Sequence, residues 1–317
     1  MGKTRVFFIT DVHGSTKCFR KFLNSAKFYN AGVLVLGGDL TGKVLIPVVE
    51  QGDGSYRCTF EDEQLMLKNK QEVDDLMSRA TDSGEYPQVM SQKDFDELSA
   101  DPKKAKAAFK GAMVTRIGEW MRLAEDRLGR TDVKCYVSPG NDDILDIDPV
   151  LNSSSFVINP EEKVVAIDDD HEMITLGTTN YTPWKSPREV SEEELGKKIE
   201  RMTDAVRNMK SAIFNIHVPP ANTLIDKAPM VDSDLKVVFS VGSVRMASIG
   251  STACRAAIER HQPMLGIHGH VHEARGTVKI GRTLCANPGS EYGQGILRGF
   301  LAEIDGDRIR SYVLTSG

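Results

Sequence analysis

The chain alternates between short apolar runs and longer segments with apolar residues at helical spacing. Residues 6–10 and 33–36 are apolar and β-favouring, as is typical of buried strands. The segment between them has a helical apolar pattern, formed by Phe19, Phe22, Leu23 and Ala26. This order predicts a β-α-β unit with two parallel strands and a right-handed crossover.

The same alternation continues through the second half of the chain. Further strands are expected at 133–137, 163–167, 173–176, 212–217 and 264–268. Helices are expected at about 192–209 and 251–260, and residues 300–314 have the pattern of a hairpin. The chain is therefore expected to have an α/β fold.

Residues 61–128 have a different composition, rich in Glu, Asp, Lys and Ala, with apolar residues at helical spacing. The pattern predicts an inserted helical segment within a single domain that spans residues 1–317. Whether this insertion covers a site is left open. Its lysines at 103, 104, 106 and 110 are compatible with a phosphate-bearing substrate, but a solvated helix face is the preferred interpretation.

Composition excludes several classes of protein. No apolar run approaches the roughly 18 residues that a membrane-spanning helix needs. The five cysteines are scattered and form no C-x-x-C pair, which favours a reduced, cytoplasmic protein. The net charge of −5 among 317 residues disfavours broad electrostatic binding of nucleic acid or acidic membranes.

Polar residues of the kind that bind metals recur where the predicted strands end. They are Asp11, His13, Asp39, Asn141, His217, His270 and His272. Ligands of open α/β sheets gather at the carboxyl ends of the strands, so these side chains are expected to converge. Carboxylate and imidazole together suit Mn, Fe or Zn.

These residues resemble the motifs of the calcineurin-like metallophosphoesterases, which are D-x-H, G-D, G-N-H-D/E, a single His and G-H-x-H in that order. The corresponding segments here are Asp11-Val12-His13, Gly38-Asp39, Gly140-Asn141-Asp142-Asp143, His217 and Gly269-His270-Val271-His272. Four of the five motifs match. In addition, Asn287-Pro288-Gly289-Ser290 resembles a turn in the small bacterial and archaeal phosphodiesterases of this family.

The resemblance implies a four-layer α/β/β/α sandwich with two divalent metal ions at the strand ends. It implies that one ion is held by Asp11, His13, Asp39 and His272. The other ion is implied to be held by Asp39, Asn141, His217 and His270, with Asp39 bridging. Two such ions lie about 3.5–4 Å apart and generate a metal-bound hydroxide that attacks the phosphorus.

Asp142 stands where the family usually has a histidine that resembles a general acid and phosphate contact. A carboxylate there repels phosphate unless it is protonated, paired or turned away. We therefore expect Asp142 to weaken activity on esters with poor leaving groups and to favour phosphodiesters or activated esters. The remaining histidines His171, His261 and His268 match no motif and are expected to be structural.

The sequence thus predicts a metal-dependent phosphoesterase, and within that class a phosphodiesterase, that acts on a small phosphoester. One alternative is a nuclease of the same superfamily, which the negative charge disfavours. The other is a metal-binding protein-interaction module with little catalysis. The intact set of metal-competent residues favours catalysis over that alternative.

Overall fold

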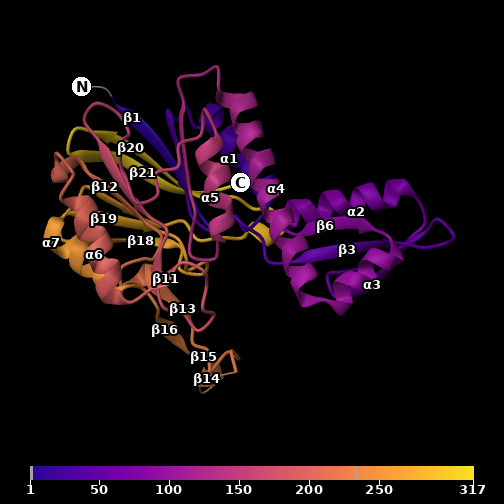
Figure 1. Cartoon of the computed structure of the whole chain (residues 1–317). Coiled ribbons are helices and arrows are strands. Elements are labelled where there is room, and N and C mark those ends of the chain that lie inside the picture. Colours follow the sequence, from indigo (N-terminus) through magenta and orange to yellow (C-terminus); the bar gives the residue numbers. More distant parts are fainter. Residues whose placement is uncertain (1–2, 233, 241) are drawn as a thin grey trace.

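Two large sheets face each other in the computed structural model, which describes residues 3–232, 234–240 and 242–317 (Figure 1). The first sheet contains, in spatial order, β21 (Arg308–Ser316), β20 (Arg298–Asp305), β1 (Thr4–Ile9), β2 (Val33–Gly37) and β7 (Lys134–Ser138). The second contains β18 (Gly276–Ile280), β19 (Thr283–Asn287), β17 (Leu265–Ile267), β12 (Ile213–Ile216), β9 (Glu172–Leu176) and β8 (Val164–Ala166). The expected α/β class is confirmed.

The predicted β-α-β unit is present at the start of the chain. Strands β1 and β2 pair in parallel, with Phe8 opposite Val35, and α1 (Thr16–Phe28) connects them. The helix begins where the Ser15 side chain accepts a hydrogen bond from the Cys18 backbone N–H, a typical N-cap. The C-terminal hairpin of β20 and β21 is also confirmed, and it pairs antiparallel with β1.

Apolar cores lie between the sheets and on their outer faces. Because successive strand residues point to opposite faces, Phe8 of β1 joins the core between the sheets. Its neighbour Phe7 joins an outer core with α1 and α4 (Pro102–Leu128), and α5 (Asp148–Ser153) adds to this layer. The outer core of the second sheet includes α6 (Glu192–Thr203) and α7 (Thr252–His261). Figure 1 shows both sheets between these two helical layers.

The chain between β2 and β7 forms an insertion that projects from the body (Figure 1, right). It contains a four-stranded sheet of β5 (Glu63–Leu67), β4 (Tyr56–Phe60), β3 (Leu45–Glu50) and β6 (Tyr86–Met90), in that order. Helices α2 (Lys70–Ser83) and α3 (Gln92–Ala100) accompany it, and α4 runs from the insertion into the body. A separate apolar core includes Val48, Phe60 and Leu76.

The expected helical character of residues 61–128 is therefore wrong in part, because β5 and β6 lie within that segment. Strand β5 is an edge strand with only Leu67 buried, so it lacks the alternation of apolar and polar residues that marks a half-buried strand. The description of residues 1–317 as a single domain stays a prediction.

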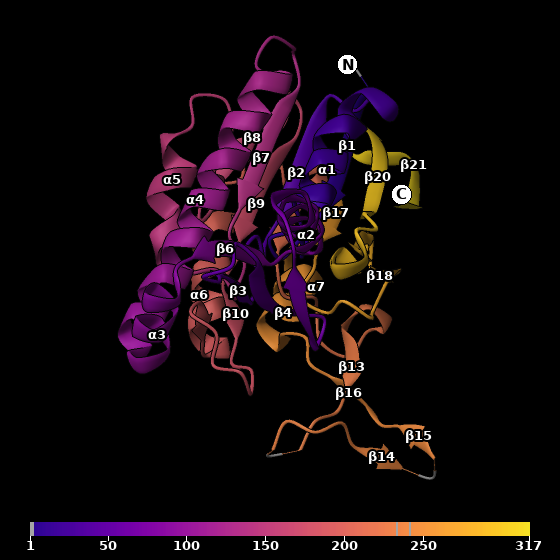
Figure 2. The ribbon, with the colours of Figure 1, turned by 90° about the vertical axis from the view of Figure 1, so that its right-hand side faces the viewer.

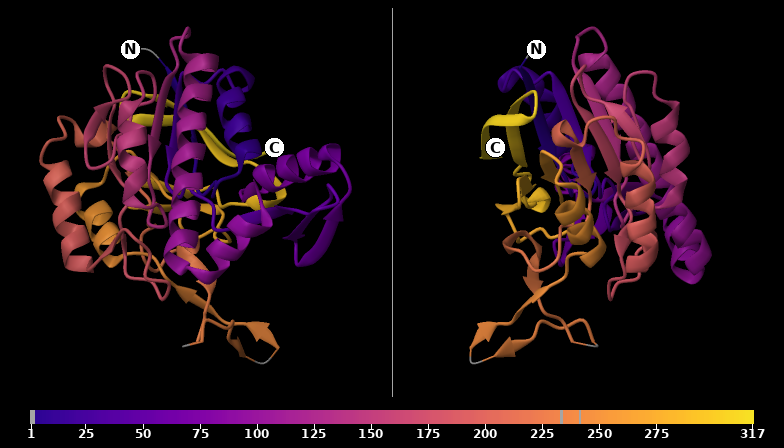
Figure 3. Two further views of the ribbon diagram at one scale, coloured as in Figure 1. Left: turned by 45° about the vertical axis from the view of Figure 1, so that its right-hand side comes forward. Right: turned by 90° about the vertical axis from the view of Figure 1, so that its left-hand side faces the viewer.

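A second projection, the arm, consists of β13 (Lys227–Pro229), β14 (Phe239–Ser240), β15 (Ser243–Val244) and β16 (Met246–Ser248) (Figure 2). Figure 3 shows the insertion and the arm leaving the body at different places. The remaining elements are β10 (Thr179–Asn180), β11 (Glu189–Val190) and the 3₁₀ turns Leu145–Ile147, Met209–Ser211, Leu224–Asp226 and Tyr292–Gln294.

None of the helices in the described ranges has the length and apolar character needed to cross a membrane.

Candidate metal centre

All seven predicted ligands lie at one edge of the body, where strands of both sheets end. Asp11 and His13 follow β1, Asp39 follows β2, Asn141 follows β7, His217 follows β12, and His270 and His272 follow β17. Five of them are buried, while His270 and His272 are partly exposed. The first sheet thus supplies the carboxylates and the second sheet supplies most of the imidazoles.

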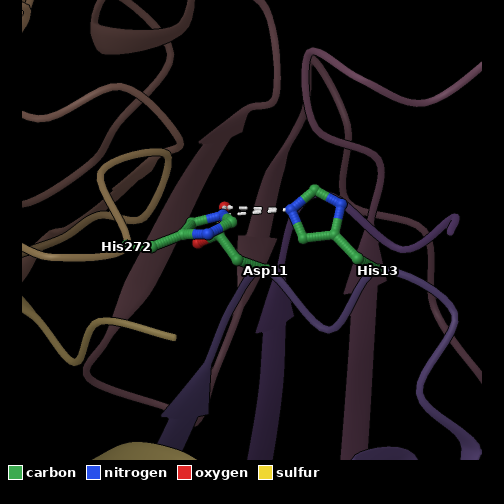
Figure 4. A group of neighbouring side chains, drawn as sticks. All are labelled: Asp11, His13 and His272. Carbon is green, nitrogen blue, oxygen red and sulfur yellow. Dashed lines mark hydrogen bonds and ion pairs between the residues drawn. The ribbon is translucent and has the colours of Figure 1, made fainter. Parts of the chain in front are cut away.

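Asp11, His13 and His272 form the first group of converging side chains (Figure 4). The Nε2 atom of His272 lies 3.3 Å from Oδ1 of Asp11, and the Nε2 atoms of His13 and His272 lie 3.0 Å apart. Each side chain offers one ligand atom, and these atoms lie within 4.8 Å of one another.

Asp39, His217 and His270 form the second group. The Nε2 atom of His217 lies 3.3 Å from Oδ2 of Asp39, and Oδ1 of Asn141 lies 2.8 Å from Nδ1 of His270. The same Oδ2 of Asp39 is 3.7 Å from Nε2 of His13, so Asp39 lies between the two groups. The structure therefore brings the seven residues together, and their binding of metal stays a prediction.

Several features of the site fit divalent cations. The buried Nε2 atom of His217 makes no hydrogen bond of good geometry among the described residues, and its nearest groups are the carboxylates of Asp39 at 3.3 Å and Asp11 at 3.8 Å. Burial alone would lower the pKa of His217, but the neighbouring carboxylates of Asp39 and Asp11 raise it to about 10. The two carboxylates therefore favour a positive charge at the position of this imidazole. Burial lowers the pKa of His13 and His270 to about 4, which keeps both imidazoles neutral, as metal ligands must be.

The backbone of four candidate ligands is left-handed. The φ angles are 53° at Asp11, 38° at His13, 51° at Asp39 and 66° at His270. Such angles are unfavourable for residues other than glycine, and they gather at functional sites where the surrounding structure holds them. Here the loops hold one another, since the backbone N–H of His13 donates to the Asp39 carbonyl at 2.9 Å.

Backbone carbonyls orient two of the imidazoles. Nδ1 of His217 lies 2.9 Å from the Gly37 carbonyl oxygen, and Nδ1 of His13 lies 3.3 Å from the Thr41 carbonyl oxygen. Each contact turns the opposite nitrogen, Nε2, toward the carboxylates. This is the usual outer support of a metal-binding histidine.

Asp143 connects the loops that follow β2 and β7. Its carboxylate accepts hydrogen bonds from the backbone N–H groups of Leu40, Thr41 and Gly140, at 2.9, 2.8 and 2.8 Å. Asp143 belongs to one of the sequence motifs, but no role was predicted for it. Its place in the motif Gly140-Asn141-Asp142-Asp143 was the one feature of the sequence that indicated a role at the site.

The segment Asn287–Ser290 supports the site from the second sheet. The hydroxyl of Ser290 donates to the Asp11 carbonyl at 2.6 Å, and its backbone N–H donates to the His272 carbonyl at 3.1 Å. The amide of Asn287 donates to the Val271 carbonyl at 2.9 Å. The segment therefore ties together the two loops that carry the first group of ligands.

Asp142 is paired and does not turn away from the site. Its Oδ2 lies 2.9 Å from Nζ of Lys43, and its Oδ1 accepts hydrogen bonds from Ser186 Oγ at 2.6 Å and Asn141 Nδ2 at 3.0 Å. It also forms a group with His13 and Asp39 whose ligand atoms lie within 4.8 Å of one another. Lys43 and Ser186 were not predicted, because they belong to no motif and lie far from Asp142 in the chain.

The three histidines outside the motifs make contacts of a structural kind. Nδ1 of His171 lies 2.7 Å from the Asp168 carboxylate, and Nε2 of His261 lies 3.0 Å from that of Glu200. Nδ1 of His268 lies 2.8 Å from the Ile216 carbonyl oxygen. None of the three belongs to the groups of candidate ligands found among the described residues.

A cavity of about 670 Å³ opens beside the metal-type residues. Asp39, Asn141, His270 and His272 lie at its polar end. Apolar side chains from three parts of the chain line the rest, including Phe109 and Met113 of α4, Trp184, and Val231, Val237 and Ile249 in and beside the arm. The helical part of the insertion thus forms one wall of the cavity, which answers the question that the sequence left open.

The chain is similar in sequence to a protein of an archaeon. The uncharacterized protein MJ1162 of Methanocaldococcus jannaschii is 30% identical over 178 residues, which cover 55% of this chain and 73% of that protein. No protein-family model matches the chain.

A solved structure shows a similar fold. TT1561 of Thermus thermophilus aligns with a TM-score of 0.54 and 12% identity, covering 100% of this chain and 99% of that one. A structure described as a novel archaeal phosphodiesterase has a TM-score of 0.36 and 11% identity over 98% of this chain and 100% of that one, too low to carry its activity across.

The identity to MJ1162 extends over most of that relative's length. The chain is therefore a member of the MJ1162 family.

Proposed function

We propose that this protein is a phosphodiesterase that uses two divalent metal ions. The observation that carries the proposal is the convergence of two groups of metal-type side chains, joined by Asp39, at the polar end of a cavity. The mixture of imidazole and carboxylate suits Mn, Fe or Zn. We interpret the two facing sheets and their flanking helices as the four-layer sandwich of the superfamily.

The residues present divide into two sets of ligands. Asp11, His13, Asp39 and His272 would hold one ion, and Asp39, Asn141, His217 and His270 would hold the other. When bound, such a pair of ions polarises the phosphate, neutralises the charge that develops on it and supplies the nucleophile.

The chain's own residues position the substrate and exclude water. The phosphate would lie at the polar end of the cavity, and an organic group would lie along Phe109, Met113 and Trp184. A cavity of about 670 Å³ offers room for a phosphate with substituents on both sides. The acidic chain and the mainly apolar wall favour a small phosphoester over nucleic acid as the substrate.

The test is a metal analysis combined with a substrate panel. Protein stripped with a chelator would be reloaded with Mn²⁺, Fe²⁺ or Zn²⁺, and then assayed with bis(4-nitrophenyl) phosphate, 4-nitrophenyl phosphate, cyclic nucleotides and DNA. We expect two ions per chain and faster hydrolysis of the diester than of the monoester.

Each part of the proposal has its own contradicting outcome. Absence of both metal and turnover would exclude the enzyme and favour a protein-interaction module. A single ion would contradict the dinuclear centre. Faster monoester hydrolysis would contradict the diester preference, and salt-sensitive cleavage of DNA would favour a nuclease.

A further inference from the structure

One fixed positive side chain lies in the cavity. Among the described residues that line it, Lys43 is the only lysine, and no arginine is present. Lys43 is on the segment between β2 and β3, at the same end of the cavity as Asp39, Asn141 and His270. A phosphate that enters the cavity therefore meets a single ammonium group besides any bound metal.

A chain of contacts holds this ammonium near the metal-type residues. Nζ of Lys43 lies 2.9 Å from Oδ2 of Asp142, and Ser186 Oγ donates to the other carboxylate oxygen at 2.6 Å. The backbone N–H of Asp142 donates to Oδ1 of Asp39 at 3.0 Å. Asp142 thus connects Lys43 to the candidate metal ligand Asp39. It is held by its contacts with Lys43, Ser186 and Asp39.

The ammonium retains hydrogen-bonding capacity. It carries three N–H donors, and in the described part of the chain its ion pair is with Asp142. The Lys43 side chain is 54% exposed, so the remaining donors are accessible from the cavity and from solvent. The same pairing compensates the charge of Asp142, which would otherwise repel a phosphate.

We propose that Lys43 binds a phosphate oxygen of the substrate, and that Asp142 and Ser186 are positioning residues that hold it there. This inference rests on the proposed function. It assigns to Lys43 the phosphate contact for which a histidine would be expected at position 142. The site would then take the monoanionic phosphate group of a diester that fits between the metal centre and this ammonium.

The test measures the binding of inorganic phosphate to metal-loaded protein by calorimetry, together with metal content. We expect Lys43→Met to weaken phosphate binding by about tenfold, the value of one charge-assisted hydrogen bond, and to leave metal content unchanged. Lys43→Arg should restore much of the binding. The matched control is Lys27→Met, which removes the same charge from an exposed residue that does not line this cavity.

The positioning role has a separate readout. Ser186→Ala should weaken phosphate binding by about twofold to tenfold when Lys43 is present. In the Lys43→Met background the same change should have no further effect, because Ser186 acts through Asp142 on Lys43. Equal effects of Ser186→Ala in both backgrounds would overturn the positioning role.

Two outcomes would overturn the role of Lys43. In the first, Lys43→Met binds inorganic phosphate as tightly as the unchanged protein. In the second, Lys43→Met loses metal as well, which would show that Lys43 serves the metal centre through Asp142. A failure of the proposed function is distinguishable, since the unchanged protein would then bind no metal and hydrolyse no bis(4-nitrophenyl) phosphate.

Discussion

Asp39 is the residue on which the two groups of candidate ligands depend, because its Oδ2 lies 3.3 Å from Nε2 of His217 and 3.7 Å from Nε2 of His13. Asp39→Asn keeps the shape of the side chain and removes its charge. We expect metal content to fall from two ions to at most one. Hydrolysis of bis(4-nitrophenyl) phosphate should fall by about 100-fold or more, because metal ions contribute several kcal/mol of transition-state stabilisation.

The control for this change is Asp53→Asn, at an exposed position in the turn between β3 and β4. It removes the same charge and should leave metal content and turnover unchanged. Two ions per chain in the Asp39→Asn protein would contradict the bridging position.

Glu161 gives a pH dependence of stability outside the metal centre. Burial raises the pKa of its carboxyl group to about 8, while both oxygens accept the Gly177 N–H at 3.0 and 2.8 Å. Between about pH 4.5 and about pH 8 the folded protein holds a proton that the unfolded chain has lost. This contribution to the free energy of unfolding is therefore present at low pH and decreases as the pH rises through that window.

Glu161→Gln removes this dependence because glutamine stays neutral. We expect the variant to gain stability relative to the unchanged protein from pH 5 to pH 8, by on the order of 2 kcal/mol, with no further gain above pH 8. Urea unfolding at several pH values measures it. Parallel pH curves for the two proteins would contradict the raised pKa.

The positions of individual candidate ligands were predictable from the sequence because each follows a strand that is itself recognisable. Asp11 and His270 are examples, since apolar runs end just before them. The contact between Lys43 and Asp142 was not predictable, because it joins two loops whose proximity depends on the complete fold. The left-handed backbone of Asp39 likewise depends on hydrogen bonds between loops and has no signal in composition.

At the scale of elements, the end of α2 is packed against the loop that carries His13. Gly84 ends this helix with a φ of +102°, and a Cβ atom there would clash with the His13 carbonyl oxygen. We expect Gly84→Ala to lower the free energy of unfolding by about 2–3 kcal/mol, through both the left-handed backbone and the clash. It should also weaken Mn²⁺ binding, because His13 must move.

Thermal unfolding and titration with Mn²⁺ measure these two effects. The matched control is Gly52→Ala, where a Cβ atom would meet nothing within 4 Å. If the Gly84→Ala protein is destabilised but binds Mn²⁺ normally, the conformation of Gly84 does not affect the loop that carries His13.

Helix α4 contributes Phe109 to the apolar wall of the cavity. Phe109→Ala should raise the KM for bis(4-nitrophenyl) phosphate by about tenfold, as expected for the loss of about 1–2 kcal/mol of apolar contact. The KM for methyl 4-nitrophenyl phosphate, which has the same leaving group and a small second substituent, should change little. Phe28→Ala is the control, since Phe28 is exposed and does not line the cavity. An equal rise in KM for both esters would contradict this role for Phe109.

Elements with a clear apolar period were predicted well, as α1 and the β20–β21 hairpin show. The insertion was predicted less well. Its strand β5 lies at a sheet edge and is mostly exposed, and it is rich in residues that also favour helices. The helix expected at 192–209 ends earlier, because α6 stops at Thr203 and a 3₁₀ turn follows at Met209–Ser211.

For the whole molecule, both sheets contribute ligands, so bound metal would hold them together. A ligand that binds only the folded state stabilises it by about 2.7 kcal/mol at 100 times its Kd. We expect Mn²⁺ to raise the free energy of unfolding by about this amount relative to protein in a chelator. The Asp39→Asn protein should show a smaller rise, and an unchanged midpoint of unfolding with saturating Mn²⁺ would contradict the site.

The α/β class was predictable because the strand and helix patterns alternate along the chain. How the arm and the insertion meet around one cavity was not, since Val237 and Phe109 come together only through the packing of the whole chain. The sequence thus located the candidate metal ligands better than the apolar walls of the cavity.

The insertion leaves the body after β2 and returns before β7, and these strands are neighbours in the first sheet. The points where the insertion leaves and rejoins the first sheet are therefore close together. A different segment from β3 to the first half of α4 would alter the wall of the cavity, while the second half of α4 stays in the core of the body and the loops after β2 and β7 keep Asp39 and Asn141 in place. If the proposed activity holds, this architecture allows the wall of the cavity to change independently of the candidate metal ligands, and grafting a segment from a relative would test it.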